Sequence, residues 1–147
     1  MKKYVLDTNL YVHAFRNAEG ARELQDFYRS FAPSTYLSSI VLHELLVGAN
    51  TDAKVRSIME TLVRPLQRVR RVITPTHAAW QSSAEAIARM SRKESRDLRS
   101  IPKSLINDYL LAASCRETGA TLVTDNVSDF AAIRRYIRLE YMEPWPG

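Results

Sequence analysis

The sequence contains little cysteine, little glycine and no long run of apolar residues. Its single cysteine, Cys115, cannot form a disulfide within the chain, and its apolar helical neighbours predict a buried, unreactive thiol. With four glycines and no tract rich in Pro, Gly or Ser, no linker is expected, so residues 1–147 are predicted to form one domain. No apolar stretch is long enough to span a membrane, and Asp7 interrupts the N-terminal apolar run. We therefore expect a cytoplasmic protein with neither a signal peptide nor a membrane partner.

Charges of both signs are present, with a basic excess. Twenty-one Lys and Arg against sixteen Asp and Glu give a net charge of +5, which favours a polyanionic partner such as nucleic acid. Hydrophobic residues make up 46% of the chain, enough to build a core and to argue against disorder.

Short apolar strands alternate with longer helical patterns along the chain. Strands are predicted at residues 4–6, 36–38, 69–73, 121–124 and 137–141. Helices are predicted at residues 10–17, 21–31, 40–49, 52–62, 75–96, 104–118 and 128–136. Helix starts are expected at Ser39, Thr74 and Ser128, and a helix stop at Gly119. This alternation predicts a three-layer α/β domain, with a central, mainly parallel sheet of about five strands and helices on both faces.

Two acidic residues directly follow predicted strands. Asp7 follows the strand at 4–6, and Asp125 follows the strand at 121–124. Ligands of parallel sheets bind outside the carboxyl ends of the strands, so both carboxylates are expected at the ligand-binding edge. Taken one at a time, each residue is better explained as a turn residue or as the N-cap of the helix that follows.

Two further acidic residues lie on apolar faces of predicted helices. Glu44 and Asp108 are each flanked at helical spacing by apolar residues on both sides. Removing an unpaired carboxylate from water costs several kcal/mol, so such groups are expected to be paired, protonated or bound to metal. A buried ion pair with His43 or Lys103 is the structural alternative for either residue alone.

Considered together, the four carboxylates predict a metal site. Like charges brought together would raise one another's pKa values unless a divalent cation neutralised them. Oxygen ligands suit Mg²⁺ or Mn²⁺ and argue against zinc, and the three histidines show no metal-ligand spacing.

Four short motifs follow one another along the chain. They are Leu-Asp-Thr-Asn at 6–9, the block at 38–48 containing Glu44, Asn-Asp to Ala-Ala at 107–113, and the segment at 122–130 containing Asp125. Their order and spacing resemble the PIN-domain ribonucleases of the VapC toxin type. The resemblance implies a Mg²⁺-dependent endoribonuclease, with Mn²⁺ as a substitute, that acts on RNA as the toxin of a toxin-antitoxin pair. It also implies a VapB-like antitoxin partner and a homodimer.

The same resemblance assigns roles to individual residues. It places the catalytic metal ligands at Asp7, Glu44, Asp108 and Asp125. Asn126 is an alternative for the fourth position, because the family motif puts Asn or Asp two residues after Thr124. Asp129 is another, because it matches a further acidic position of the same loop. The residues expected to orient the carboxylates and bound waters are Thr8, Asn9, Thr124, Asn126 and Asp129.

A basic cluster precedes the helix that carries Asp108. Its members are Arg89, Arg92, Lys93, Arg96, Arg99 and Lys103. An RNA backbone lying along them would be delivered to the acidic residues, and a solvated helix face is the alternative interpretation.

Two other functions compete with cleavage. A catalytically silent PIN-like RNA-binding module would use the basic surface without cutting, although such a module would be expected to have lost one of the acids. A phospho-acceptor receiver domain would need paired acids after the first strand, where this sequence has only Asp7.

Overall fold

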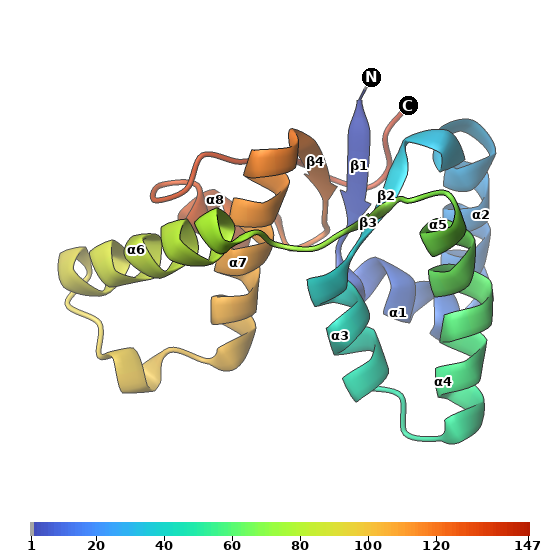
Figure 1. The fold of residues 1–147 in the computed structure, drawn as a ribbon, viewed down its shortest axis with the longest axis horizontal. Helices are drawn as coiled ribbons and strands as arrows, with labels where there is room; N and C mark the ends of the chain where they lie inside the picture. The colour runs from blue at the N-terminus through green and yellow to red at the C-terminus, as the bar shows by residue number, and fades with distance from the viewer. Residues whose placement is uncertain (1) are drawn as a thin grey trace.

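Five short strands form the centre of the protein in a computed structural model that describes residues 2–147 (Figure 1). They are β1 (Lys3–Leu6), β2 (Thr35–Ser38), β3 (Val72–Ile73), β4 (Ala120–Val123) and β5 (Glu140–Met142). Every neighbouring pair is parallel, in the order β3-β2-β1-β4-β5. Strand β1 pairs Val5 with Tyr36 of β2 and with Leu122 of β4. The predicted parallel sheet is confirmed.

Helices cover both faces of this sheet. One layer comprises α1 (Thr8–Arg16), α2 (Ala18–Phe31), α3 (Ser39–Val47), α4 (Asp52–Ile58) and α5 (Arg64–Arg68), with the short turns η1 (Ala32–Ser34) and η2 (Met59–Val63). The other layer comprises α6 (His77–Lys93), η3 (Leu98–Ser100), α7 (Lys103–Thr118) and α8 (Val127–Ile133). Figure 1 shows α6, α7 and α8 on the left of the sheet and the first layer on the right. The three-layer architecture is therefore also confirmed.

Two predicted strands differ from the observed ones. Strand β3 has only two residues, because Arg70 adopts a positive φ of 57° in a turn and the Arg71 amide donates to the carbonyl of Leu66. Strand β5 begins at Glu140, later than the predicted 137, although Ile137 and Leu139 before it are buried. The apolar residues Ile137 and Leu139 therefore belong to the core without pairing in the sheet.

The helix starts also need correction, whereas the predicted stop is right. Helix α6 is capped by Thr76 rather than Thr74, whose hydroxyl instead lies 2.8 Å from that of Ser39. Helix α3 is capped by Ser38, one residue before the predicted Ser39. Helix α8 follows Asn126 instead of starting at Ser128. Gly119 ends α7 in the left-handed conformation that favours glycine, with φ 70°.

The core lies between the sheet and the two helical layers. Strand β4 is buried along its whole length, as expected for a central parallel strand. Near the C-terminus, the Trp145 ring packs on Phe27, and its Nε1 donates to Glu23 at 2.8 Å. Cys115 is fully buried, and burial raises the pKa of its thiol to about 12, as predicted for an unreactive cysteine. None of the helices within residues 2–147 is both long and apolar enough to cross a membrane.

Candidate active site

The carboxyl ends of β1 and β4 lie side by side where the strand order reverses, which is the ligand position in open parallel sheets. Asp7 follows β1 directly and is 6% exposed. Its Oδ1 accepts from the Thr8 amide at 2.9 Å, which caps α1, and its Oδ2 accepts from the Thr124 hydroxyl at 2.7 Å. The hydroxyl oxygen of Thr124 in turn accepts a hydrogen bond of 2.9 Å from the backbone N–H of Asn126. The ends of both strands thus fix the orientation of Asp7.

Glu44 reaches this edge from α3. Its Oε1 accepts a hydrogen bond of 2.8 Å from the Thr8 hydroxyl, so Thr8 links Glu44 to the end of β1. The side chain is half-buried, whereas the helical pattern predicted a buried face, because α3 packs on the core through Val41 and Leu45 and leaves Glu44 at the margin.

Asp108 reaches the site from α7 and is also half-buried. Its pKa is raised from 3.8 to about 7, first by desolvation and then by the charges of Asp7, Glu44 and Asp129. The ion pairs within residues 2–147 all join other residues. The ion pairs with His43 or Lys103 that the sequence left open are therefore not formed.

The neighbouring acids also affect the pKa of Asp7. Burial raises its pKa above the usual range, the hydrogen bonds from Thr124 and Thr8 oppose this, and the charges of Glu44 and Asp125 add to the rise. The charge of Glu44 raises the pKa values of both Asp7 and Asp108, and the charge of Asp7 also raises the pKa of Asp108. The three acids, which come from three different elements, thus lie within electrostatic range of one another.

The loop after β4 supplies two further acids, both exposed. Asp125 acts electrostatically on Asp7, whereas Asp129 acts on Asp108. The Asn126 amide donates from Nδ2 to Asp129 Oδ2 at 2.8 Å, so Asn126 orients Asp129. Asn9 is exposed and forms no side-chain hydrogen bond within residues 2–147, so the structure does not bring it into this network. Which loop residue completes the site stays a prediction.

The donor chemistry of the cluster fits a hard divalent cation. The candidate ligands all offer side-chain oxygens, which are carboxylates except at Asn126, and the repulsion among the carboxylates is uncompensated by any basic side chain of residues 2–147. As the side chains stand, no three His, Cys, Asp or Glu of the described chain are grouped to hold an ion. Binding would therefore require the carboxylates to draw together.

A cavity of about 250 Å³ opens beside the carboxylates, between α6, α7 and α8. Its polar wall is formed by Glu94, Arg96, Ser104, Asp108 and Asp129. Its apolar wall is formed by Met90, Leu105, Ala132 and Ile133, with Pro102 and Tyr109. No sequence pattern singles out Glu94 or Ser104 as wall residues, because only the packing of α6 against α7 and α8 places them beside Asp108.

The structure divides the predicted RNA-binding cluster. Arg96 alone of the six lines the cavity. Arg89 donates to the Tyr136 carbonyl at 2.5 Å, and Arg99 lies 3.6 Å from Asp97. Arg92 and Lys93 occupy the exposed last turn of α6, and Lys103 the exposed first residue of α7.

The fold and site define an open parallel α/β domain with acidic side chains at its switch point, the position where sheets of this class bind ligands. The particular family is identified by a PIN domain model that matches residues 4–136, and the chain belongs to the PIN domain family. A comparison with curated proteins finds no match.

Solved structures share this fold at low identity. A chain of the DNA-bound VapBC from Salmonella typhimurium gives a TM-score of 0.70 at 22% identity, covering 97% of this chain and 98% of that chain. FitAcB from Neisseria gonorrhoeae gives 0.68 at 20% identity, covering 97% and 98%. VapBC2 from Rickettsia felis, bound to a DNA fragment from its promoter, gives 0.67 at 22% identity, covering 95% and 97%. The likeness spans the whole domain.

Proposed function

We propose that this PIN domain is a Mg²⁺-dependent endoribonuclease that acts as a VapC-type toxin. The observation that carries the proposal is the convergence of Asp7, Glu44 and Asp108 at the switch point, with no cationic side chain of residues 2–147 paired to them. Such an arrangement stores electrostatic repulsion in the metal-free protein, which a bound divalent cation would relieve.

Asp7, Glu44 and Asp108 would hold the Mg²⁺, or Mn²⁺ in its place, and Asp125, Asn126 or Asp129 would complete the set. When bound, such an ion lowers the pKa of a water molecule and offsets charge on the phosphoryl oxygens. The chain's own contribution is orientation. Each Asp7 oxygen already accepts one hydrogen bond and keeps a further lone pair for a ligand, so Thr8 and Thr124 aim the carboxylate without blocking it.

The toxin role is supported by the structural neighbours, which include VapBC complexes. An apolar cavity of about 340 Å³ between α1, α3 and α4 offers a place for an antitoxin segment. Phe15 is 49% exposed at this cavity, although large apolar side chains are usually covered. Glu44 lies at the same cavity, so we propose that a VapB-like antitoxin seated there would also cover one of the carboxylates.

Cleavage of RNA by the purified protein tests the enzymatic proposal. We expect cuts in Mg²⁺ or Mn²⁺, none in EDTA, and 5′-phosphate and 3′-hydroxyl ends. Asp7→Asn should abolish both cleavage and growth inhibition while keeping the fold. Parallel Asp125→Asn and Asp129→Asn variants identify the fourth ligand, because only the true ligand should shift the metal concentration needed for half-maximal activity.

The competing function has a distinct signature. A catalytically silent RNA-binding module would bind RNA with the salt dependence of phosphate contacts and leave it intact at every metal concentration. The proposed VapB-like antitoxin and the homodimer are tested together by co-expression with the product of any short gene found beside this one and by measuring the mass of the complex in solution.

A further inference from the structure

The cavity between α6, α7 and α8 shares two walls with the carboxylate site. Asp108 and Asp129, both candidate ligands of that site, line it. A molecule bound at the carboxylates therefore has direct access to the cavity.

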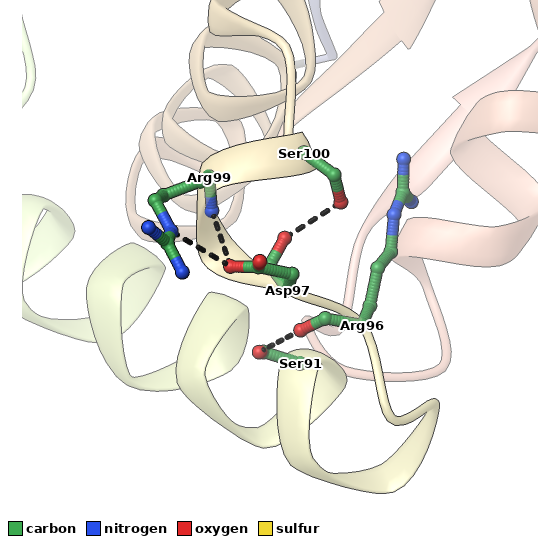
Figure 2. A network of polar contacts seen from close by, with 5 residues as sticks. All are labelled: Ser91, Arg96, Asp97, Arg99 and Ser100. Carbon is green, nitrogen blue, oxygen red and sulfur yellow. Dashed lines mark hydrogen bonds and ion pairs between the residues drawn. The ribbon is translucent and has the colours of Figure 1, made fainter.

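The turn between α6 and α7 holds Arg96 at this cavity through its main chain (Figure 2). The Arg96 amide donates to the Ser91 carbonyl at 2.9 Å, and its carbonyl accepts from the Ser91 hydroxyl at 2.5 Å. Asp97 and Ser100 close the next turn, with the Asp97 carbonyl accepting from the Ser100 hydroxyl at 2.7 Å. In Figure 2 the Arg96 guanidinium extends away from these contacts. The turn is thus built by the backbone of Arg96 and leaves its side chain available to a ligand.

Size and charge define what the cavity can take. Its volume of about 250 Å³ lies below the roughly 300–1,000 Å³ of pockets for drug-sized ligands, which suits a single ring system. The carboxylates of Glu94, Asp108 and Asp129 repel a phosphate from the interior, whereas Arg96 attracts one. The apolar side chains of half-buried Leu105 and exposed Ala132 offer a surface for the flat face of a base.

We infer that this cavity receives the base of one nucleotide flanking the scissile phosphate, while Arg96 binds the phosphate of that nucleotide. The inference rests on the proposed cleavage of RNA and adds to it a subsite that selects sequence. Base identity at one position beside the cut would then depend on the walls of this cavity.

Filling the cavity tests the subsite with a closely matched control. Ala132 and Ala131 are neighbours on α8 and both exposed, but only Ala132 lines the cavity. Ala132→Phe and Ala131→Phe are compared with the parent protein on a randomised RNA pool in Mg²⁺, with the cut ends sequenced and thermal unfolding checked. We expect Ala132→Phe to raise KM about tenfold and to change the base preferred at one flanking position, whereas Ala131→Phe leaves both unchanged.

Removing the Arg96 side chain provides an independent measurement. Arg96→Ala keeps the main-chain contacts of the turn. Arg22→Ala is the control, because Arg22 is exposed on α2 in the other layer and its replacement makes the same change of charge. In EDTA, Arg96→Ala should reduce the slope of log affinity against log salt by about 0.7, and Arg22→Ala should leave it unchanged.

The outcomes separate the subsite from the proposed function. If the parent protein cleaves but Ala132→Phe keeps the parental KM and base preference, the subsite is wrong and the nuclease function stands. If Arg96→Ala and Arg22→Ala change the salt slope equally, Arg96 contributes only to the general charge of the surface, and its proposed phosphate contact is refuted. If the parent protein cleaves no RNA in Mg²⁺ or Mn²⁺, the function and the subsite fall together.

Discussion

Replacing the half-buried Asp108 by asparagine should stabilise the metal-free protein. Desolvation and the charges of Asp7, Glu44 and Asp129 all disfavour the ionised form of Asp108. The described neighbours donate no hydrogen bond to its carboxylate that would offset this. Asparagine has nearly the same shape and no charge, so the substitution removes repulsion without leaving a space.

The magnitude follows from the pKa of Asp108. A rise from 3.8 to about 7 corresponds to at most about 4 kcal/mol at a pH above both values, since one pKa unit equals about 1.4 kcal/mol. Because the side chain is only half-buried, solvent screens part of this repulsion, and we expect a gain of about 1–2 kcal/mol at pH 8.

The sign depends on pH in a defined way. The raised pKa means that the folded protein holds a proton on Asp108 that the unfolded chain has released between about pH 4 and 7. Stability from this group is therefore fully present below about pH 4 and is lost as the pH rises from about 4 to 7. At pH 5 Asp108 is neutral in the folded protein but mostly ionised in the unfolded chain, so the gain from Asp108→Asn should be clearly smaller than at pH 8, and it should vanish only below about pH 4.

Urea unfolding in EDTA at pH 8 and pH 5 measures this difference. Asp26→Asn is the control, because it makes the same chemical change at an exposed carboxylate that pairs only with Arg29 at 3.3 Å. We expect that control to alter the free energy of unfolding by less than about 1 kcal/mol at both pH values. If Asp108→Asn destabilises the protein at pH 8, or has equal effects at both pH values, the repulsion attributed to the carboxylate cluster is wrong.

Three further results are expected. Millimolar Mg²⁺ or Mn²⁺ should raise the Tm of the parent protein by binding only its native state, and this rise, followed by calorimetry, should be much smaller in Asp108→Asn. Thr124→Val should destabilise the protein by about 1–3 kcal/mol in denaturant unfolding, because Thr124 both donates to Asp7 and accepts from the Asn126 amide in a buried position; an unchanged free energy would contradict this. Phe15→Asp should prevent co-purification with the antitoxin while RNA cleavage persists, and a stable complex would remove the α1, α3 and α4 cavity from the interface.

The sequence alone was sufficient to predict the order of strands and helices and the acidic edge. These features depend on local signals: apolar runs of strand length, helical spacing, and an acid placed directly after a strand. Gly119 is another local signal, because a glycine at the end of a helical pattern by itself predicts the positive φ that ends the helix. Asp7 likewise both follows β1 and caps α1 through contacts with its immediate neighbour.

Only the tertiary structure decided which side chains act on one another. Thr124 reaches Asp7 because β1 and β4 pair in register, and this pairing joins residues 117 positions apart in the chain. Glu44 and Asp108 are half-buried rather than buried, since helical spacing defines a face but not how far the neighbouring layer extends over it. Arg96 faces the cavity while other members of its basic cluster do not, because the turn between α6 and α7 sets its direction through main-chain bonds. Long-range contacts of this kind depend on how the layers pack, which no local pattern in the sequence specifies.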